Sequence, residues 1–334
     1  MESAVRVTSM GKRESMDEPW RLSVCVVTYE RPAFLQRCLL SLREGLDDSA
    51  EVVVVDASAN DHGELAREVD AAVVYVHAPH LAGWMTRSRN EALRWVRGEI
   101  VSFLDDDVVL RSGWQQSLLT AFDDPTVVAV SGRTCNGVPG EEHYDRPIGR
   151  LLADGTLTDG FASLPDGPVD VDHGIGANMS FRRSVLAELG GFRDDYPGTA
   201  LREDTDIFLR IRALGGRALF APQAAVDHKP APHVRGARFD TRYKLYGRRN
   251  HMVLLARDGG IRSPLLRRWA LLQLKQVTKA RGLDGRARRL GVSLLGLAWG
   301  ALAMVRSARW RPLPPRRDDA LGRELRNALS RAAV

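Results

Sequence analysis

Short apolar runs alternate with helical patterns along the first part of the chain. The runs are rich in valine and carry few polar positions, as do strands that are buried on both faces. Between them, apolar residues recur three or four positions apart, which is typical of helices that bury one side. The pattern predicts strands at residues 22–28, 51–56, 72–76 and 99–104, and helices at residues 32–42, 63–70 and 86–96.

This alternation predicts an α/β fold with a Rossmann-like, mostly parallel sheet flanked by helices. The carboxyl ends of parallel strands meet at one edge of the sheet, and ligands bind beyond that edge. Thr28 and Tyr29 end the first predicted strand, Asp56 closes the second and Asp105 follows the fourth. We therefore expect these side chains to lie on one rim.

The acidic run Asp105-Asp106-Asp107 has two interpretations, a solvated turn or a cation site. The run directly follows a strand that is predicted to be buried. Three carboxylates at one strand end repel one another unless a cation lies among them. Mg²⁺ and Mn²⁺ prefer such oxygen ligands and share them with substrate phosphates. The position of the run therefore favours a divalent-metal site.

The pattern is less regular in the second half of the chain. Residues 132–170 are rich in Gly, Pro and Asp, which predicts long connections. An extended segment, a short helix, an amphipathic helix and a strand are predicted at residues 174–181, 184–189, 203–214 and 217–221. Beyond Asp240 the chain is predicted to be helical, with breaks at Pro264, Gly282, Gly285 and residues 312–315.

Charge is distributed unevenly along the 334 residues, whose net charge is +6. Residues 261–334 contain 17 Lys and Arg against 4 Asp and Glu, a net charge of +13, which leaves −7 for the remainder. Residues 290–305 are uncharged, but spanning a bilayer takes about 20 residues. This basic helical extension predicts contact with an anionic membrane surface, or packing on the catalytic domain or on a second subunit in a homodimer. Nucleic acid is not an expected partner, because basic and aromatic residues are not interleaved.

The N-terminal segment and the cysteines bear on localisation. Residues 1–20 carry scattered charges and no apolar stretch, so we expect a disordered segment and no signal peptide. The three cysteines, Cys25, Cys38 and Cys135, show no metal-binding spacing. These features predict a reduced, cytoplasmic protein, or one peripheral on the inner face of the plasma membrane.

An ordered set of motifs over residues 20–255 resembles the family 2 glycosyltransferases of the GT-A fold. The resemblance implies a GT-A catalytic domain at residues 21–255 and an appended extension at residues 256–334. The residues that carry it are Val26 to Pro32, Val55-Asp56, Arg89-Asn90, Phe103 to Asp107, Gly176 to Phe181, Gly190 to Phe192 and Glu203 to Asp206.

The resemblance assigns the donor site residue by residue. The first strand end and the acid closing the second strand hold the nucleotide base in this family, and the aspartates of its DxD motif hold the donor ribose and the metal. Ribose contact falls to Asp105 and metal ligation to Asp107, while Asp106 fits either role because three consecutive acids leave the register open by one. The donor-binding residues implied in this chain are Thr28, Tyr29, Glu30, Asp56, Arg89, Asp105 and Asp106, with Arg89 directed at phosphate.

The resemblance also names catalytic and further metal residues. The Glu203-Asp204 pair opens the predicted helix, and its aspartate is the family's general base. Thr205 and Asp206 are alternatively helix-capping residues. His228 matches a metal-ligating histidine of many GT-A enzymes, with His233 as the second choice and a purely structural histidine as the alternative. The metal ligands implied are therefore Asp107, Asp105 and His228.

The expected activity is inverting, Mn²⁺- or Mg²⁺-dependent transfer of a sugar from a nucleoside diphosphate sugar to a hydroxyl-bearing acceptor. Asp56 suits uracil, and thymine differs by one methyl group, so UDP- and dTDP-sugars are both open. The acceptor classes are cell-surface polysaccharide, lipid-linked glycan and secondary metabolite. The rival functions are a sugar-nucleotide nucleotidyltransferase and a non-catalytic nucleotide-binding homologue. The nucleotidyltransferase would want a glycine-rich basic loop where Thr28 to Pro32 stand.

Overall fold

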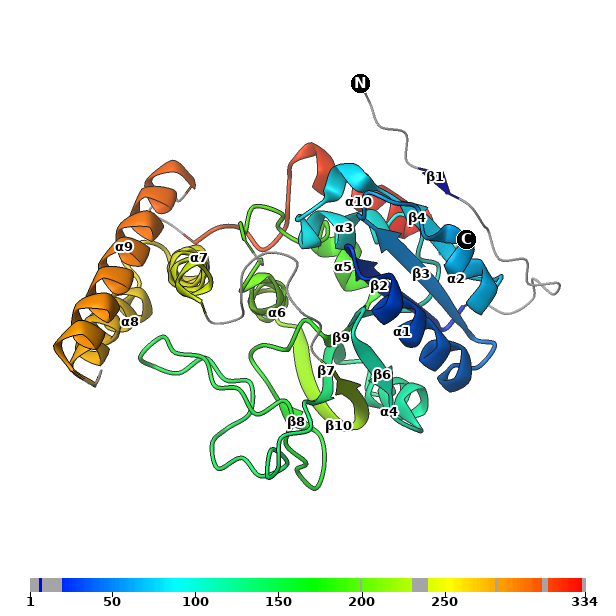
Figure 1. The fold of residues 1–334 in the computed structure, drawn as a ribbon, viewed down its shortest axis with the longest axis horizontal. Coiled ribbons are helices and arrows are strands. Elements are labelled where there is room, and N and C mark those ends of the chain that lie inside the picture. The colour runs from blue at the N-terminus through cyan, green and yellow to red at the C-terminus, as the bar shows by residue number, and fades with distance from the viewer. Residues whose placement is uncertain are drawn as a thin grey trace.

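The computed structural model describes residues 6–7, 20–198, 200–229, 240–279, 282–307 and 312–331. One sheet with covering helices forms the larger part of the molecule, and a separate group of helices stands beside it (Figure 1). The strands are β1 (Arg6–Val7), β2 (Leu22–Thr28), β3 (Ala50–Asp56), β4 (Val74–His77), β5 (Ile100–Asp105), β6 (Val108–Leu110), β7 (Val127–Cys135), β8 (Val169–Asp170), β9 (Asn178–Arg182) and β10 (Arg217–His228).

The helices cover the sheet or form the separate group. The α-helices are α1 (Pro32–Gly45), α2 (Gly63–Val69), α3 (Met85–Ala92), α4 (Trp114–Ala121), α5 (Arg183–Leu189), α6 (Glu203–Ala213), α7 (Thr241–Gly259), α8 (Pro264–Lys275), α9 (Leu283–Ser307) and α10 (Ala320–Arg331). Two short 3₁₀ helices, η1 (Pro79–Leu81) and η2 (Gln276–Lys279), complete the set.

The sheet order is β1-β4-β3-β2-β5-β9-β7-β10-β6, and β8 also pairs with β10. Strands β4, β3, β2 and β5 are parallel, which confirms the sequence prediction for the first half. Strand β9 lies antiparallel between β5 and β7, and β6 runs antiparallel to β10. The second half is therefore mixed, so the sheet is parallel on one side and mixed on the other.

Alternate side chains of the central strands fill two apolar layers. Val24 and Val26 of β2 pack with α1, α2 and α4, whereas Cys25 faces the layer formed with α3, α5 and α6. This alternation follows from the two-residue period of a strand. Both layers are fully buried, so the strands are rigid supports for whatever lies at their carboxyl ends.

The last helix, α10, belongs to the sheet domain. Leu325 and Leu329 are buried in the same apolar layer as Leu186 and Leu189 of α5. The chain returns to this position after an excursion through α8 and α9, and the amide of Leu313 donates to the carbonyl of Arg257 over 2.9 Å. The residue range 256–334 is thus not one appendage, since its end packs on the catalytic sheet and the boundary at 255 falls inside α7.

Three sequence expectations differ from the structure. Strand β10 continues through an irregularity between Ala221 and Ala225, so His228 lies at the end of this strand and not after a loop. Gly285 does not end a helix, because α9 runs through it. Arg6–Val7 pairs with β4, while the remainder of the expected disordered segment up to residue 19 lies outside the described residues.

Helices α7, α8 and α9 pack on one another beside the sheet domain (Figure 1). Trp269 of α8 and Leu255 of α7 are buried in a small core of their own. Within the described part of the chain, no helix is both long enough and apolar enough to cross a membrane. The helical prediction beyond Asp240 is confirmed for these elements.

Candidate active site

The ends of β2, β3 and β5 form one rim, as the alternation of elements predicts. Thr28 pairs with Asp56 across β2 and β3, and Val27 pairs with Asp105 across β2 and β5. The hydroxyl of Thr28 donates to Oδ2 of Asp106 over 2.6 Å. Residues far apart in the sequence therefore meet where a parallel sheet presents its ligand site.

Asp105, Asp107 and His228 form a cluster with the geometry of a metal site. Each offers one ligand atom, and these three atoms lie within 4.8 Å of one another. Nε2 of His228 is 3.2 Å from Oδ1 of Asp107, because β10 ends beside β6 and the turn that follows β5. Two carboxylates and an imidazole are suitable ligands for a divalent cation. The residues present therefore fit the implied metal.

The side chain of Asp106 lies outside the cluster that Asp105 and Asp107 form with His228. Its carboxylate accepts the Thr28 hydroxyl and forms an ion pair of 3.1 Å with Arg31. Burial is the main cause that raises the pKa of Asp106, to about 7, and the hydrogen bond from Thr28 and the charge of Arg31 oppose this rise. Asp105 and Asp107 therefore lie in the metal-type cluster, whereas the side chain of Asp106 contacts Thr28 at the end of β2.

Arg31 is a site residue that the sequence reasoning did not select. It also lies 3.7 Å from Oδ2 of Asp107, so it contacts two of the three aspartates. Its place directly before α1, three residues after Thr28, was the available signal. A cation at this position partly balances the acidic rim and presents positive charge beside the candidate metal ligands.

Arg89 joins the acidic rim to the start of α6. Its guanidinium is buried, lies 3.6 Å from Oδ1 of Asp105 and donates to Oε1 of Glu203 over 2.6 Å. It also donates to the carbonyl of Gly176 over 3.1 Å. A Cβ at position 176 would approach the Arg89 guanidinium to 3.1 Å, which explains a glycine there. Arg89 is thus held by protein groups on three sides.

Glu203 and Asp204 differ in environment although they are adjacent. Burial, followed by the charge of Asp204, raises the pKa of Glu203 to about 8, against the opposing charge of Arg89. Asp204 is more accessible, and its Oδ2 accepts from the amide of Gly176 over 3.3 Å. Its other oxygen accepts from the amide of Thr205. The pair therefore offers one enclosed carboxyl and one carboxylate that faces the site.

Asp206 supports the helix from behind. It accepts from Arg193 and from the hydroxyl of Tyr196, over 2.8 and 2.9 Å. Burial alone would raise the pKa of Asp206, but Arg193, Arg210 and Arg257 together lower it. In the described hydrogen bonds, the Thr205 hydroxyl donates to Asp204 and Asp206 accepts from Arg193 and Tyr196, so neither Thr205 nor Asp206 is bonded to an amide of the first turn of α6.

The expected base-binding residues lie at the same rim but already have protein partners. Asp56 is fully buried, accepts from the amide of Ser58 and from the Tyr75 hydroxyl, and forms a hydrogen bond of 2.7 Å with Nδ1 of His62. Glu30 has a positive φ of 56° and accepts the amide of Ala59. Asp56 and Glu30 therefore fix the loop after β3.

Tyr29 and His233 are the remaining candidates from the sequence. Tyr29 is partly buried and packs on the core beneath the rim. Arg87, which lies two residues before Arg89 on α3, is exposed and stacks over Trp84, so it is a surface residue. His233 lies outside the described residues.

Comparison with known proteins identifies the family. A sequence profile described as Glycosyl transferase family 2 matches residues 23–190, which include the whole acidic rim. The chain belongs to this family. It is therefore a glycosyltransferase, and the sugar-nucleotide nucleotidyltransferase is set aside.

Two known proteins are similar in sequence to this chain. It is 28% identical to the succinoglycan biosynthesis protein ExoM of Rhizobium meliloti, over 66% of this chain and 70% of that protein. It is 32% identical to the pre-mycofactocin glycosyltransferase of Mycobacterium tuberculosis, over 64% of this chain but only 44% of the relative. The match thus spans less than half of the mycobacterial protein.

Solved structures show the same fold. The mannosyltransferase PcManGT from Pyrobaculum calidifontis, in complex with GDP-Man and Mn²⁺, is 21% identical with a TM-score of 0.54, over 95% of this chain and 90% of that one. GalNAc-T7 with UDP, GalNAc and Mn²⁺ is 17% identical with a TM-score of 0.58, over 91% of this chain and 60% of the other. The predicted GT-A fold of this glycosyltransferase is confirmed.

Proposed function

We propose that this glycosyltransferase moves a sugar from a nucleoside diphosphate sugar to an acceptor hydroxyl, with inversion at the anomeric carbon. The observation that supports this most is the connection through Arg89. One guanidinium contacts Asp105 of the metal-type cluster and Glu203 of the Glu203-Asp204 pair. The proposed donor site and the proposed base are thus linked by one guanidinium, which is 3.6 Å from Asp105 and hydrogen-bonded to Glu203 beside Asp204, and this arrangement suits a single displacement.

The donor that we propose is a UDP- or dTDP-sugar. Thr28, Tyr29, Glu30 and Asp56 form the rim on which the base would lie, with Asp105 at the ribose. Solved relatives are described with GDP-Man and with UDP-GlcNAc, so nucleotide-sugar binding is common to this fold. Direct contact of Asp56 with a base would replace one of its present hydrogen bonds.

Mn²⁺ or Mg²⁺ would be held by Asp105, Asp107 and His228. When bound, the cation would neutralise the diphosphate that leaves with the nucleoside. His228 favours Mn²⁺, because Mg²⁺ prefers oxygen ligands almost exclusively. Arg31, which already contacts Asp106 and Asp107, adds positive charge at the same place.

Asp204 is the proposed general base. It accepts the proton of the acceptor hydroxyl as that oxygen attacks the anomeric carbon and the bond from that carbon to the diphosphate oxygen breaks. The amide of Gly176 holds the carboxylate in place, and the neighbouring Glu203 is turned toward Arg89. We assign Glu203 to the positioning of Asp204.

The acceptor classes that we propose are cell-surface polysaccharide, lipid-linked glycan and secondary metabolite. Related proteins are described as acting in succinoglycan biosynthesis, on pre-mycofactocin and on glucosyl-dolichyl phosphate. We place the reaction at the cytoplasmic face of the plasma membrane, with the basic helices against an anionic surface. The three described cysteines are free and buried, in agreement with a reducing compartment.

The test is transfer and hydrolysis of a panel of nucleotide-sugars, with Mn²⁺ and with chelator. Asp204→Asn should lower turnover by about 100-fold or more, because general-base catalysis contributes about 10²- to 10⁴-fold. The same variant should bind donor as the parent does. Asp159→Asn, at an exposed position, is the matched control and should keep full turnover. Full turnover by Asp204→Asn would show that the base is another group.

A further inference from the structure

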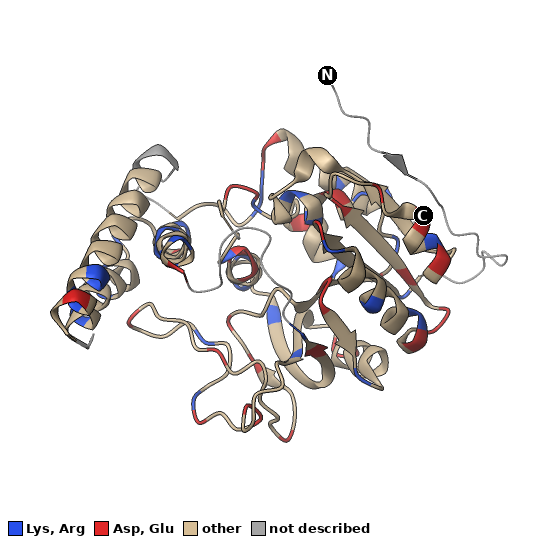
Figure 2. Ribbon diagram, viewed as in Figure 1, with Lys and Arg blue, Asp and Glu red and all other residues tan. Residues whose placement is uncertain are grey.

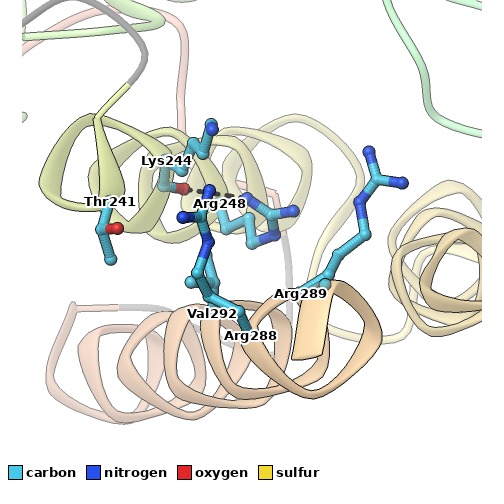
Figure 3. Close-up of a pocket in the computed structure, with 7 residues that line it drawn as sticks. Thr241, Lys244, Arg248, Arg288, Arg289 and Val292 are labelled. Atoms are coloured by element: carbon cyan, nitrogen blue, oxygen red, sulfur yellow. Dashed lines mark hydrogen bonds between the residues drawn. The ribbon is translucent and has the colours of Figure 1, made fainter. Parts of the chain in front are cut away.

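A basic pocket lies between α7 and α9, away from the rim of the sheet. Its volume is about 330 Å³. Figure 3 shows side chains from both helices converging on it. The lining residues are Thr241, Lys244, Arg248, Gly285, Arg288, Arg289 and Val292. Four of these seven residues are cationic, and the other three are uncharged.

The four cations have no acidic partner among the described residues. Hydrogen bonds from Arg248 and Arg289 reach only backbone carbonyls, of Lys244 and Gln276. Burial, and then the nearby charge of Arg289, lowers the pKa of Arg248. Like charges that crowd a partly desolvated pocket are unfavourable by themselves, and an anion would remove that cost.

Helix α9 continues from this pocket with an exposed apolar side. Leu295 and Leu302 follow Arg288 at intervals of seven residues, so the three lie on one side of the helix. Leu295 is 64% exposed and Leu302 is 50% exposed. The neighbouring Leu294 is 51% exposed. In Figure 2, charged residues of α9 lie at its N-terminal end, and residues 290–305 of the same helix carry no charge.

We propose that the α7–α9 pocket binds the phosphate of an anionic membrane phospholipid while the exposed leucines of α9 enter the interfacial region of the same membrane. Cations beside an apolar helix side are what an interfacial helix presents to anionic lipid. This inference rests on the proposed function only for the presence of a membrane, and it names the lipid site, which that function does not.

Charge decides between a membrane and a second copy of the chain. A two-fold interface through α9 would bring identical surfaces together. Such a dimer would place Arg288 and Arg289 of both copies in one region, where Asp284 is the single acid that α9 supplies, so positive charge would remain in excess. An anionic lipid surface complements these cations, so it is the favoured occupant.

The test is co-sedimentation of the full chain with vesicles of phosphatidylcholine alone or with about one third phosphatidylglycerol, at low ionic strength. The parent should bind the anionic vesicles and leave the neutral ones. Arg288→Gln/Arg289→Gln should weaken this binding by about tenfold or more, because each basic residue near such a surface contributes measurably. Binding of the parent to neither vesicle would overturn the proposal.

The matched control is Arg67→Gln/Arg331→Gln, which removes the same charge from exposed positions on α2 and α10. It should change vesicle binding less than about twofold, since the loss depends on place and not on net charge. An equal loss in both double variants would overturn the assignment of a pocket. Tight binding of inorganic phosphate by a parent that ignores vesicles would overturn the lipid in favour of a free anion.

Leu294→Gln/Leu295→Gln tests the apolar part without affecting a core, since both side chains are exposed. Vesicle binding should fall while the sedimentation coefficient of the free protein stays the same. A change from dimer to monomer with unaltered vesicle binding would assign this side to a second copy and overturn the proposal. Donor hydrolysis with Mn²⁺ should be unchanged in all three double variants. Vesicle binding by a parent without any donor turnover would sink the proposed function and leave the lipid site standing.

Discussion

At the residue scale, the three consecutive aspartates show how position divides one residue type into separate roles. Asp105 ends β5, and the turn after it directs Asp106 to Thr28 and Arg31, while Asp107 meets His228. Identical side chains thus have different partners because the backbone changes direction between them. The acidic run carries a metal-type cluster through two of its members only.

Mn²⁺ affinity should follow this division. Asp107→Ala removes one of three clustered ligands, so we expect Mn²⁺ to bind at least about tenfold more weakly, as measured from free Mn²⁺ by electron paramagnetic resonance. Asp106→Asn keeps an oxygen for the Thr28 hydroxyl and should change the affinity less than about threefold. Equal losses in the two variants would mean that Asp106 is a ligand.

Kinetic measurements on a variant of Arg89 distinguish two roles for this residue, the positioning of Glu203 and contact with the donor phosphate. If it positions Glu203, then Arg89→Lys should lower kcat by about 10- to 100-fold with little change in donor affinity, because one ammonium does not reproduce contacts to Glu203, Gly176 and Asp105. A donor phosphate contact would instead weaken donor binding. Arg87→Lys, exposed on the same helix, should leave both quantities unaltered.

The sequence and the family resemblance indicated which acids to examine, but not their contacts. The alternating pattern was sufficient to place Thr28, Asp56 and Asp105 on one rim, since parallel strands end together. The contact between Arg89 and Glu203 joins residues 114 positions apart and depends on how α3 and α6 pack on the sheet. Arg31 lies directly before α1, which was a local signal for a site residue, but its partners Asp106 and Asp107 depend on the packing of distant segments.

At the element scale, α10 follows one of the alternatives that the sequence left open for the basic extension, because it packs on the sheet domain. Its composition is that of a basic amphipathic helix, which suits a surface or an interface equally well. Leu325 and Leu329 instead complete the apolar layer under α3 and α5. Helix periodicity identifies the apolar side but not the surface that covers it. The antiparallel direction of β9 could not be predicted either, because a five-residue pattern does not encode the direction of a strand.

Shortening a buried side chain of α10 should therefore destabilise the sheet domain. Leu325→Ala is expected to lower the free energy of unfolding by about 2–4 kcal/mol, the usual range for a buried leucine. Leu302→Ala on α9, where the side chain is half exposed, should cost less than about 0.5 kcal/mol. Urea unfolding followed by tryptophan fluorescence measures both. Similar small effects would mean that α10 packs only weakly.

At the scale of the whole molecule, the proposed active site is assembled from both ends of residues 21–255. Strands β2 and β5, helix α6 and the end of β10 all contribute, so ligand binding should stabilise the sheet domain as a unit. With Mn²⁺ and a bound nucleotide at 100 times the dissociation constant, unfolding should cost about 2.7 kcal/mol more. Differential scanning calorimetry with and without chelator measures this.

The matched control for that measurement is the metal-site variant. Asp107→Ala should lose most of the Mn²⁺-dependent rise in melting temperature, whereas Leu294→Gln/Leu295→Gln should retain it. A rise of equal size in Asp107→Ala would indicate stabilisation by metal bound elsewhere on the chain.

The hydrogen bond between Leu313 and Arg257 gives the helices α8 and α9 the form of an insertion. The chain leaves α7 just after Arg257 and returns beside it at Leu313, so the length and shape of the excursion place little demand on the sheet domain. Such a segment is open to replacement during evolution or in the laboratory. Exchanging this segment between related enzymes would show whether α8 and α9 govern the proposed membrane binding independently of the sheet domain.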